Sequence, residues 1–93
     1  MFLTWMIIGL AVSAIAVITV SVLITVSVIK EILNSNDTGL NNPMSATIES
    51  KLKDGNHTKI KVKFKDIYGN TSTREIRSEQ GADVYTGQTI YKS

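Results

Sequence analysis

The chain has 93 residues, no cysteine and a formal net charge of +2, and 43% of its residues are hydrophobic. Without cysteine it can form neither a disulfide bond nor a thiolate metal site, and it has no cysteine nucleophile. Every lysine, arginine, aspartate and glutamate lies at or after Lys30. The chain therefore divides into an uncharged apolar start and a charged remainder, which at this length is expected to form at most one small domain.

The first part of the chain predicts a transmembrane helix. Residues 2–29 carry no charged side chain, and Phe2 and Trp5 lie near the start, where the aromatic residues of a membrane interface are common. About 20 apolar residues suffice to cross the hydrocarbon core of a bilayer as a helix. A cleaved signal peptide would have a basic start and a shorter apolar stretch. We therefore expect residues 1–33 to hold one membrane-spanning helix and a juxtamembrane turn.

The second half of this apolar run carries a pattern that competes with the helix. Residues 17–22 and 23–28 nearly repeat one another, and β-branched residues alternate along both with a period of two. In water such alternation is typical of a β-strand. A lone strand in lipid would leave its backbone amides without partners, so a helix is favoured for this run.

Small residues recur along one stripe of the expected helix, at the spacing that lets two membrane helices approach closely. The candidates for helix packing are Gly9, Ser13, Ala16, Val20 and Ser27. Small residues are also common in spans that pack against nothing. Lys30 is the only basic side chain close to either end of the run, and positive charge favours the cytoplasmic side. The sequence thus predicts a single-pass membrane protein with a cytoplasmic C-terminal domain.

The charged remainder predicts a linker and a small β-domain. Residues 34–45 contain four asparagines, two serines, Gly39 and Pro43, which is typical of a polar linker. Apolar and polar residues then alternate along residues 46–53 and 59–65, and shorter strands are expected in 71–77 and 84–91. The expected fold class is α+β, in which the transmembrane helix precedes an antiparallel meander of four to five strands over residues 46–93. This meander is expected to be barrel-like, as in an OB or SH3 domain.

The alternation also predicts how the strands pair. A three-residue turn over residues 54–56 places Ile48 opposite Val62 and Glu49 opposite Lys61. In the next hairpin we expect Phe64 opposite Ile76. The expected core consists of some tyrosine rings and of Ile48, Leu52, Ile60, Val62, Phe64, Ile76, Val84 and Ile90. A core of this size stabilises a domain little without a disulfide or metal, so a partner is expected to supply further burial.

Three segments carry a resemblance to known proteins. They are Ala46-Thr47-Ile48, then Val62-Lys63-Phe64-Lys65-Asp66 with Gly69, and finally residues 84–91. In this order they resemble small membrane-associated β-domains of bacterial families of unknown function. The resemblance covers the last half of the chain and departs at Gln88, where the pattern usually has Asp. It implies a small β-domain and brings no catalytic residue with it.

The sequence offers little catalytic chemistry. His57 is the only histidine, and it lies near an expected turn with no second soft metal ligand in the chain. Several carboxylates are expected to pair with lysine or arginine across strands, which removes them from acid–base work. No glycine-rich phosphate loop occurs. We therefore expect no enzyme activity, no metal and no cofactor.

A row of lysines is the most distinctive feature of the charged part. The four residues Lys59, Lys61, Lys63 and Lys65 alternate with apolar residues and so share one face of a strand. They can form a solvated face or guard a strand edge against unwanted pairing. They can instead attract anionic lipid headgroups. Nucleic acid is disfavoured, because no aromatic platform for stacking bases accompanies them.

Together these observations predict a non-catalytic, single-pass accessory or assembly subunit that docks on a membrane protein complex. Its expected partners are membrane lipid and either another membrane protein or further copies of the same chain. The alternative is a self-associating, membrane-active protein, such as a pore former or a phage-type effector, in which the span is the active part.

Overall fold

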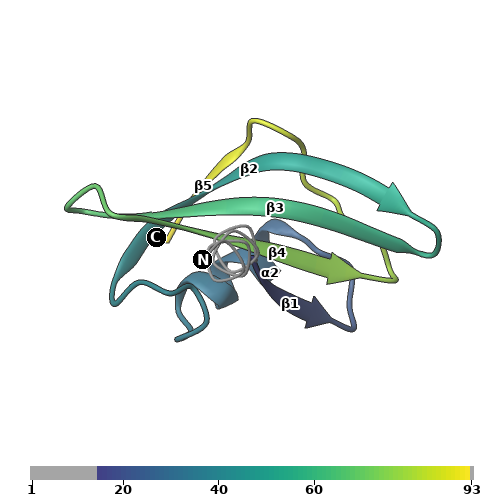
Figure 1. Cartoon of the computed structure of the whole chain (residues 1–93), viewed down its shortest axis with the longest axis horizontal. Helices are drawn as coiled ribbons and strands as arrows, with labels where there is room; N and C mark the ends of the chain where they lie inside the picture. Colours follow the sequence, from purple (N-terminus) through teal and green to yellow (C-terminus); the bar gives the residue numbers. More distant parts are fainter. Residues whose placement is uncertain (1–14, 93) are drawn as a thin grey trace, which may run out of the picture.

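A computed structural model describes residues 15–92 and shows a mixed sheet with one short helix against one of its faces (Figure 1). The sheet has five strands in the order β1-β4-β3-β2-β5. Strand β1 is parallel to β4, and the other neighbours are antiparallel. In chain order the elements are β1 (Ala16–Val20), α2 (Val26–Leu33), β2 (Pro43–Asp54), β3 (His57–Asp66), β4 (Thr71–Ser78) and β5 (Thr89–Tyr91).

The predicted transmembrane helix is wrong for the part of the chain that the structure describes. Ala16–Val20 forms a strand, and α2, which follows it, has only eight residues. Within residues 15–92 no helix is both long enough and apolar enough to cross a membrane. This finding overturns the fold class that placed such a helix before an antiparallel domain. It also overturns the single-pass localisation and the cytoplasmic placement predicted from Lys30.

The helix was favoured because a lone strand would lack hydrogen-bonding partners, and the fold removes that objection. Strand β4, far along the chain, pairs with β1 and sets Ile18 beside Ile76 and Thr19 beside Arg77. The β-branched residues of the apolar run suit an extended backbone better than a helix. Once a partner strand is present, the period-two pattern of the run forms a strand.

After β1 the chain is held by backbone and hydroxyl contacts to the segment that follows β4. The hydroxyl of Ser78 donates a hydrogen bond of 2.6 Å to the carbonyl of Val22. The backbone N–H of Ile24 donates to the carbonyl of Gly81 at 3.0 Å, and the Ile24 carbonyl accepts from Asp83 N–H at 2.7 Å. These contacts satisfy polar backbone groups inside a run that looks uniformly apolar in sequence.

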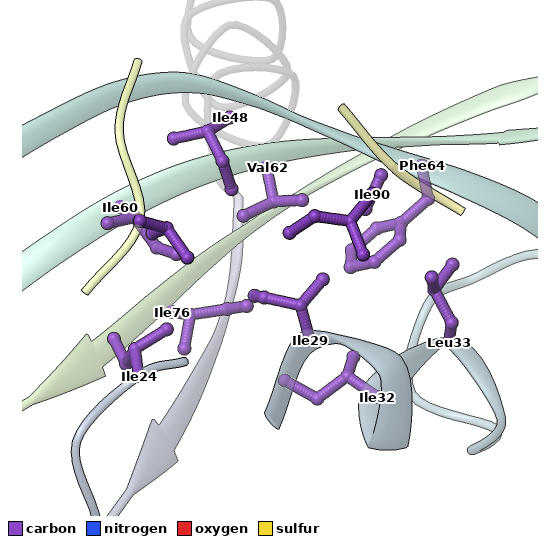
Figure 2. Packing of buried hydrophobic residues seen from close by; sticks show 12 residues of the cluster. Ile24, Ile29, Ile32, Leu33, Ile48, Ile60, Val62, Phe64, Ile76 and Ile90 are labelled. Atoms are coloured by element: carbon purple, nitrogen blue, oxygen red, sulfur yellow. The ribbon is translucent and has the colours of Figure 1, made fainter. Parts of the chain in front are cut away.

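Helix α2 has a regular start and end. Thr25 is its N-cap, and the Thr25 hydroxyl accepts a hydrogen bond of 3.3 Å from Val28 N–H. At the other end Asn34 N–H donates to the Lys30 carbonyl at 3.1 Å. The helix is amphipathic, and its apolar face packs against the sheet (Figure 2). The buried residues of α2 are Ile29, Ile32 and Leu33.

The core lies between α2 and the sheet (Figure 2) and includes all the predicted aliphatic and phenylalanine residues except Leu52. Ala46 and four residues from the segment before β2 complete it, namely Ile24 and Ile29 of the apolar run and Ile32 and Leu33 just after it. Burial of four such side chains contributes roughly 6–12 kcal/mol before conformational entropy is subtracted. The chain itself therefore supplies the burial that the sequence argument assigned to a partner.

In the first hairpin one predicted residue pair is present, but the turn length that sets it differs from the prediction. Ile48 lies opposite Val62, which confirms the predicted pair. The turn, however, has two residues, 55–56, because β2 runs to Asp54 and β3 starts at His57. A bulge at Glu49 adds the residue that corrects the parity, and it leaves Glu49 without a partner in β3. The predicted pair of Glu49 with Lys61 is therefore wrong.

The bulge also explains why Leu52 is absent from the core. Beyond it, Leu52 turns to the outer face and is 64% exposed. Lys51 takes the inner position, where its Nζ donates to the carbonyls of Ala82 at 2.9 Å and Val84 at 3.1 Å. Lys51 thus holds the loop before β5 against β2 by two hydrogen bonds.

The second hairpin has a different register from the one predicted. Ile76 lies opposite Ile60, and Phe64 lies opposite Ser72. The shift is an even number of residues, so Phe64 and Ile76 both stay on the core face. Parity alone could not distinguish the two registers.

Asp66 organises the turn between β3 and β4, which covers residues 67–70. The Asp66 carboxylate accepts hydrogen bonds of 2.9 Å from the N–H groups of Tyr68 and Asn70. Gly69 has φ +86°, a conformation that favours glycine. Partial burial opposes ionisation of Asp66, but hydrogen bonds from Asn70, Tyr68 and Gly69 outweigh it and hold the Asp66 pKa below its usual value.

Candidate docking surface

The sheet has one covered and one uncovered face within residues 15–92. Helix α2 lies on the core side, and no other described helix or strand lies on the opposite side (Figure 1). We call this opposite side the outer face. The strand registers assign to it Val17, Thr19, Ser45, Thr47, Ser50, Leu52, Lys59, Lys61, Lys63, Lys65, Thr71, Thr73, Glu75, Arg77, Thr89 and Tyr91.

The four predicted lysines form a row along the outer face. Alternation in β3 buries Ile60, Val62 and Phe64 and turns the lysines between and beside them outward. Successive lysines are about 6.7 Å apart along the strand, because each residue of a strand advances about 3.3 Å. Strand β3 is the middle strand of the sheet. The lysines therefore cannot be guarding an exposed edge, which was one of the interpretations of the sequence.

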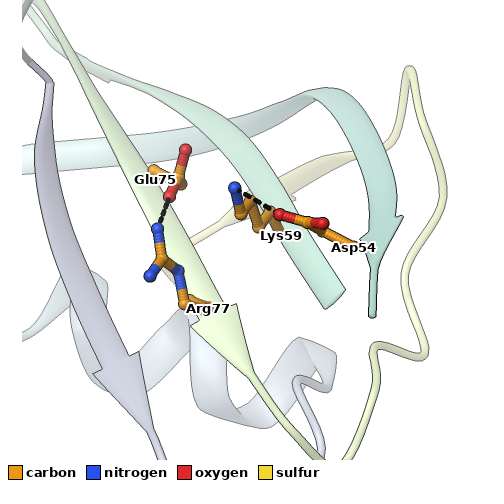
Figure 3. Close-up of polar contacts among 4 residues, drawn as sticks. All are labelled: Asp54, Lys59, Glu75 and Arg77. Atoms are coloured by element: carbon orange, nitrogen blue, oxygen red, sulfur yellow. Dashed lines mark hydrogen bonds and ion pairs between the residues drawn. The ribbon is translucent and has the colours of Figure 1, made fainter. Parts of the chain in front are cut away.

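Two ion pairs neutralise part of the outer face (Figure 3). Lys59 Nζ lies 3.0 Å from Asp54 Oδ2, and Arg77 Nη2 lies 3.0 Å from Glu75 Oε2. The hydrogen bond and positive charge of Lys59 hold the Asp54 pKa below its usual value. Among the residues described, the three lysines that follow Lys59 along β3 make no ion pair. Their positive charges are left at the centre of the face.

Hydroxyl groups flank Lys63 and Lys65 on both sides, whereas Lys61 has Ser50 on one side and Glu75 on the other. Lys63 has Thr47 beside it on β2 and Thr73 beside it on β4, and Lys65 has Thr71. Thr47 is also 3.1 Å from Thr89 of β5, hydroxyl to hydroxyl. The outer face is thus a strip of ammonium and hydroxyl groups, which together can bind carboxylates by charge and hydrogen bonding.

Aromatic side chains do not accompany the lysine row. In the described part of the chain, Tyr91 is the aromatic residue on the outer face, and it lies in β5, two strands from β3. Tyr68 and Tyr85 are exposed in turns. The lysines therefore lack the neighbouring aromatic side chains on which the bases of a single-stranded nucleic acid stack.

The predicted helix-packing residues do not share a helix where the structure describes them. Ala16 and Val20 lie in β1, and Ser27 lies in α2. Gly9 and Ser13 lie outside the described residues. Val20 instead packs against the edge of the core, whereas Ala16 and Ser27 are exposed.

One polar contact that the sequence did not predict joins His57 and Glu79. His57 Nε2 lies 3.4 Å from Glu79 Oε1 in an open depression of about 540 Å³ between the end of β1 and the first hairpin. Ser21 also lines the depression but makes no hydrogen bond to His57. A serine–histidine–carboxylate site needs a connected chain of such bonds. Within residues 15–92 no group of three potential metal ligands occurs.

Comparison with known proteins adds no relative: no family model, no curated protein and no solved structure matches the chain. The resemblance to small bacterial β-domains therefore stays a prediction.

Proposed function

We propose that this chain is a non-catalytic docking subunit, which binds an acidic surface of a larger partner protein through the outer face of its sheet. One observation carries the proposal. Lys61, Lys63 and Lys65 stand in a row at the centre of an uncovered face, and none of them makes an ion pair within residues 15–92.

The spacing of the lysines supports binding to a surface with several negative charges. At about 6.7 Å they lie within the screening length of roughly 8 Å at physiological salt, so their potentials add. Such a row attracts an acidic partner from a distance and speeds association. In the complex, carboxylates would replace the water that now solvates the ammonium groups.

The surroundings of the row favour a protein over a lipid or a nucleic acid. The Lys59–Asp54 and Arg77–Glu75 pairs place carboxylates among the positive groups, so the outer face presents both signs of charge to a partner. Threonine hydroxyls beside Lys63 and Lys65 offer directional hydrogen bonds. A protein surface with both charges and polar groups matches this pattern best.

The role is that of an accessory or assembly component. The core does not need a partner to complete it, because residues that precede β2 already do so. The proposal therefore rests on the chemistry of the outer face alone and makes no use of a membrane span.

A charge reversal tests the proposal. The full chain and its Lys63→Glu variant would be cross-linked in cells that express them, and the cross-linked proteins would be identified by mass spectrometry. We expect at least one protein to be recovered with the wild-type chain and lost with Lys63→Glu. With that protein purified, its Kd for the chain should rise about tenfold or more on reversal, because one like-charge contact replaces an attraction.

Matched controls separate a specific site from general charge. Lys30→Glu on α2 and Lys53→Glu at the first hairpin make the same charge change at exposed positions off the outer face. They should leave binding unchanged. Equal loss in all three variants would contradict a defined docking surface. Binding of the wild type to phosphatidylserine vesicles, lost in Lys63→Glu with no protein recovered, would assign the row to lipid instead.

A further inference from the structure

Strand β1 lies at an edge of the sheet and lacks the features that protect edges. Its five residues, Ala16–Val20, contain no charge, proline or glycine. The opposite edge strand, β5, has only three residues and follows a turn at Gly87. Natural proteins usually shorten, charge or cover an edge strand, because its free N–H and C=O groups pair readily with another strand. By that standard β5 is protected, whereas β1 has no such protection from the residues that the structure describes.

The edge of β1 is also open along its length within residues 15–92. A depression of about 440 Å³ lies at its start, beside Asp37 and Arg74, and the depression that contains His57 lies at its end. Val17 is 48% exposed on the outer face. Another strand can therefore reach this edge without displacing any described element.

We infer that β1 pairs in antiparallel orientation with the β1 strand of a second copy of this chain. The two-fold axis passes between the Ile18 residues of the two copies. The two sheets then form one continuous sheet. This inference concerns a different surface from the lysine row and does not rest on the proposed function.

The register through Ile18 keeps both faces of the joined sheet consistent. Ile18 lies opposite the partner's Ile18, and Ala16 lies opposite the partner's Val20, all on the core side. Val17 lies opposite the partner's Thr19 on the outer face. Ile18 and Val20 are half-buried and already pack against the core at its margin, so pairing would bury apolar surface that is now open. No other element within residues 15–92 has to move.

The charge distribution allows a two-fold contact. A symmetric interface brings identical surfaces together, so a charged strand would repel itself, and β1 carries no charge. On the neighbouring strand, Glu75 and Arg77 neutralise one another. The lysine rows of the two copies would be separated by five strand spacings, about 24 Å, which exceeds the screening length of roughly 8 Å. The row therefore does not oppose the dimer.

A second copy fits this edge better than an unrelated segment, because β1 is complementary to itself. Its core-side residues are all apolar, and its outer residues are one valine and one threonine that exchange places about the axis. The dimer would carry two lysine rows on one face, one from each copy.

Cysteine cross-linking tests the register, and the chain has no cysteine to interfere. Val17→Cys and Thr19→Cys would be made separately in the full chain. Directly opposite residues of antiparallel strands have Cα atoms about 4.5–5.5 Å apart, which suits a disulfide, whereas diagonal neighbours lie about 7–8 Å apart. We therefore expect a mixture of the two variants to form a disulfide-linked heterodimer on mild oxidation. Either variant alone should cross-link at least tenfold less.

A second measurement checks the edge itself. Val17→Lys places a charge on β1, beside the two-fold axis. The dissociation constant of the dimer, measured by sedimentation, should rise at least tenfold. Leu52→Lys makes the same type of change on the outer face in β2, away from the edge, and should leave the dimer unchanged. A wild-type chain that stays monomeric at 100 µM would overturn the inference. Cross-linking of Val17→Cys alone as strongly as the mixture would overturn the register.

Discussion

The described part of the apolar run, residues 16–29, and the meander of β2, β3 and β4 contribute to the same core, yet their sequences indicate that role with different clarity. In β3, lysine at every second position marks the outer face, so the core face is unambiguous. In the apolar run no charge marks either face, and both a helix and a strand fit the pattern. The comparison shows that polar residues at defined positions identify an element better than apolar residues do.

The two regions also differ in where their partners lie. Strands β2, β3 and β4 pair with neighbours in sequence through short turns. Strand β1 pairs with β4, which follows it only after a helix and two strands. Such long-range pairing leaves no local signature, because it depends on how the rest of the chain closes.

The largest test asks whether α2 contributes to the core as much as the meander does. Ile29→Ala in α2 and Ile60→Ala in β3 both remove a fully buried side chain. Each should lower the free energy of unfolding by about 2–5 kcal/mol, the usual range for such a deletion. Urea unfolding followed by circular dichroism measures both. Val22→Ala, at a side chain that is 52% exposed, should change it by less than about 0.5 kcal/mol. An equally small effect of Ile29→Ala would mean that the apolar run does not complete the core.

A smaller effect is expected where one hydroxyl joins the two regions. Ser78 is buried, donates to the Val22 carbonyl and accepts from Gln80 N–H at 3.0 Å. Ser78→Ala leaves both backbone groups without this partner and should lower the free energy of unfolding by about 1–3 kcal/mol. Thr71→Ala on the outer face serves as the control and should be nearly neutral. If the two substitutions have equal effects, the Ser78 contact does not hold the apolar run to β4.

The smallest effect concerns the outer face, through the ion pair of Asp54 and Lys59. The folded-state pKa of Asp54 lies below its usual value of 3.8, chiefly through the hydrogen bond from Lys59. A lowered folded pKa stabilises the fold above the unfolded pKa, and this contribution is lost as the pH falls through the folded pKa. Asp54→Asn should therefore reduce stability at pH 6 slightly, and the difference from wild type should shrink as the pH falls below 3.8. A difference that persists at low pH would show that the asparagine acts by another route than charge.

The strands of the meander were largely predictable, and the errors within it have local causes. The alternation around Val62 and Phe64 predicted their burial and the outward lysines. Leu52 was placed wrongly because a bulge at Glu49 reverses the parity of β2, and nothing in the sequence there marks a bulge. The register of Phe64 was wrong because an even shift keeps every side chain on its face.

The residues of the candidate site could be predicted from the sequence, but their place in the sheet and their ion pairs could not. Alternation alone placed the four lysines on one face of a strand. That this strand is the middle one follows only from the order of the strands. That Asp54 pairs with Lys59 and Glu75 with Arg77, while Lys63 makes no ion pair within residues 15–92, follows only from the folded structure. The contact between His57 and Glu79 was missed because the two residues are brought together by the ends of different hairpins.

By itself, the sequence determined which side chains of β3 point inward and which point outward, because a period of two without a bulge leaves each residue one face. It also determined the turns at Gly55 and Gly69, where the backbone needs a positive φ. Only the tertiary structure decided which backbone conformation the described part of the apolar run adopts. An uncharged segment takes whichever backbone satisfies its N–H and C=O groups, and that choice depended on a partner strand, β4, distant in sequence.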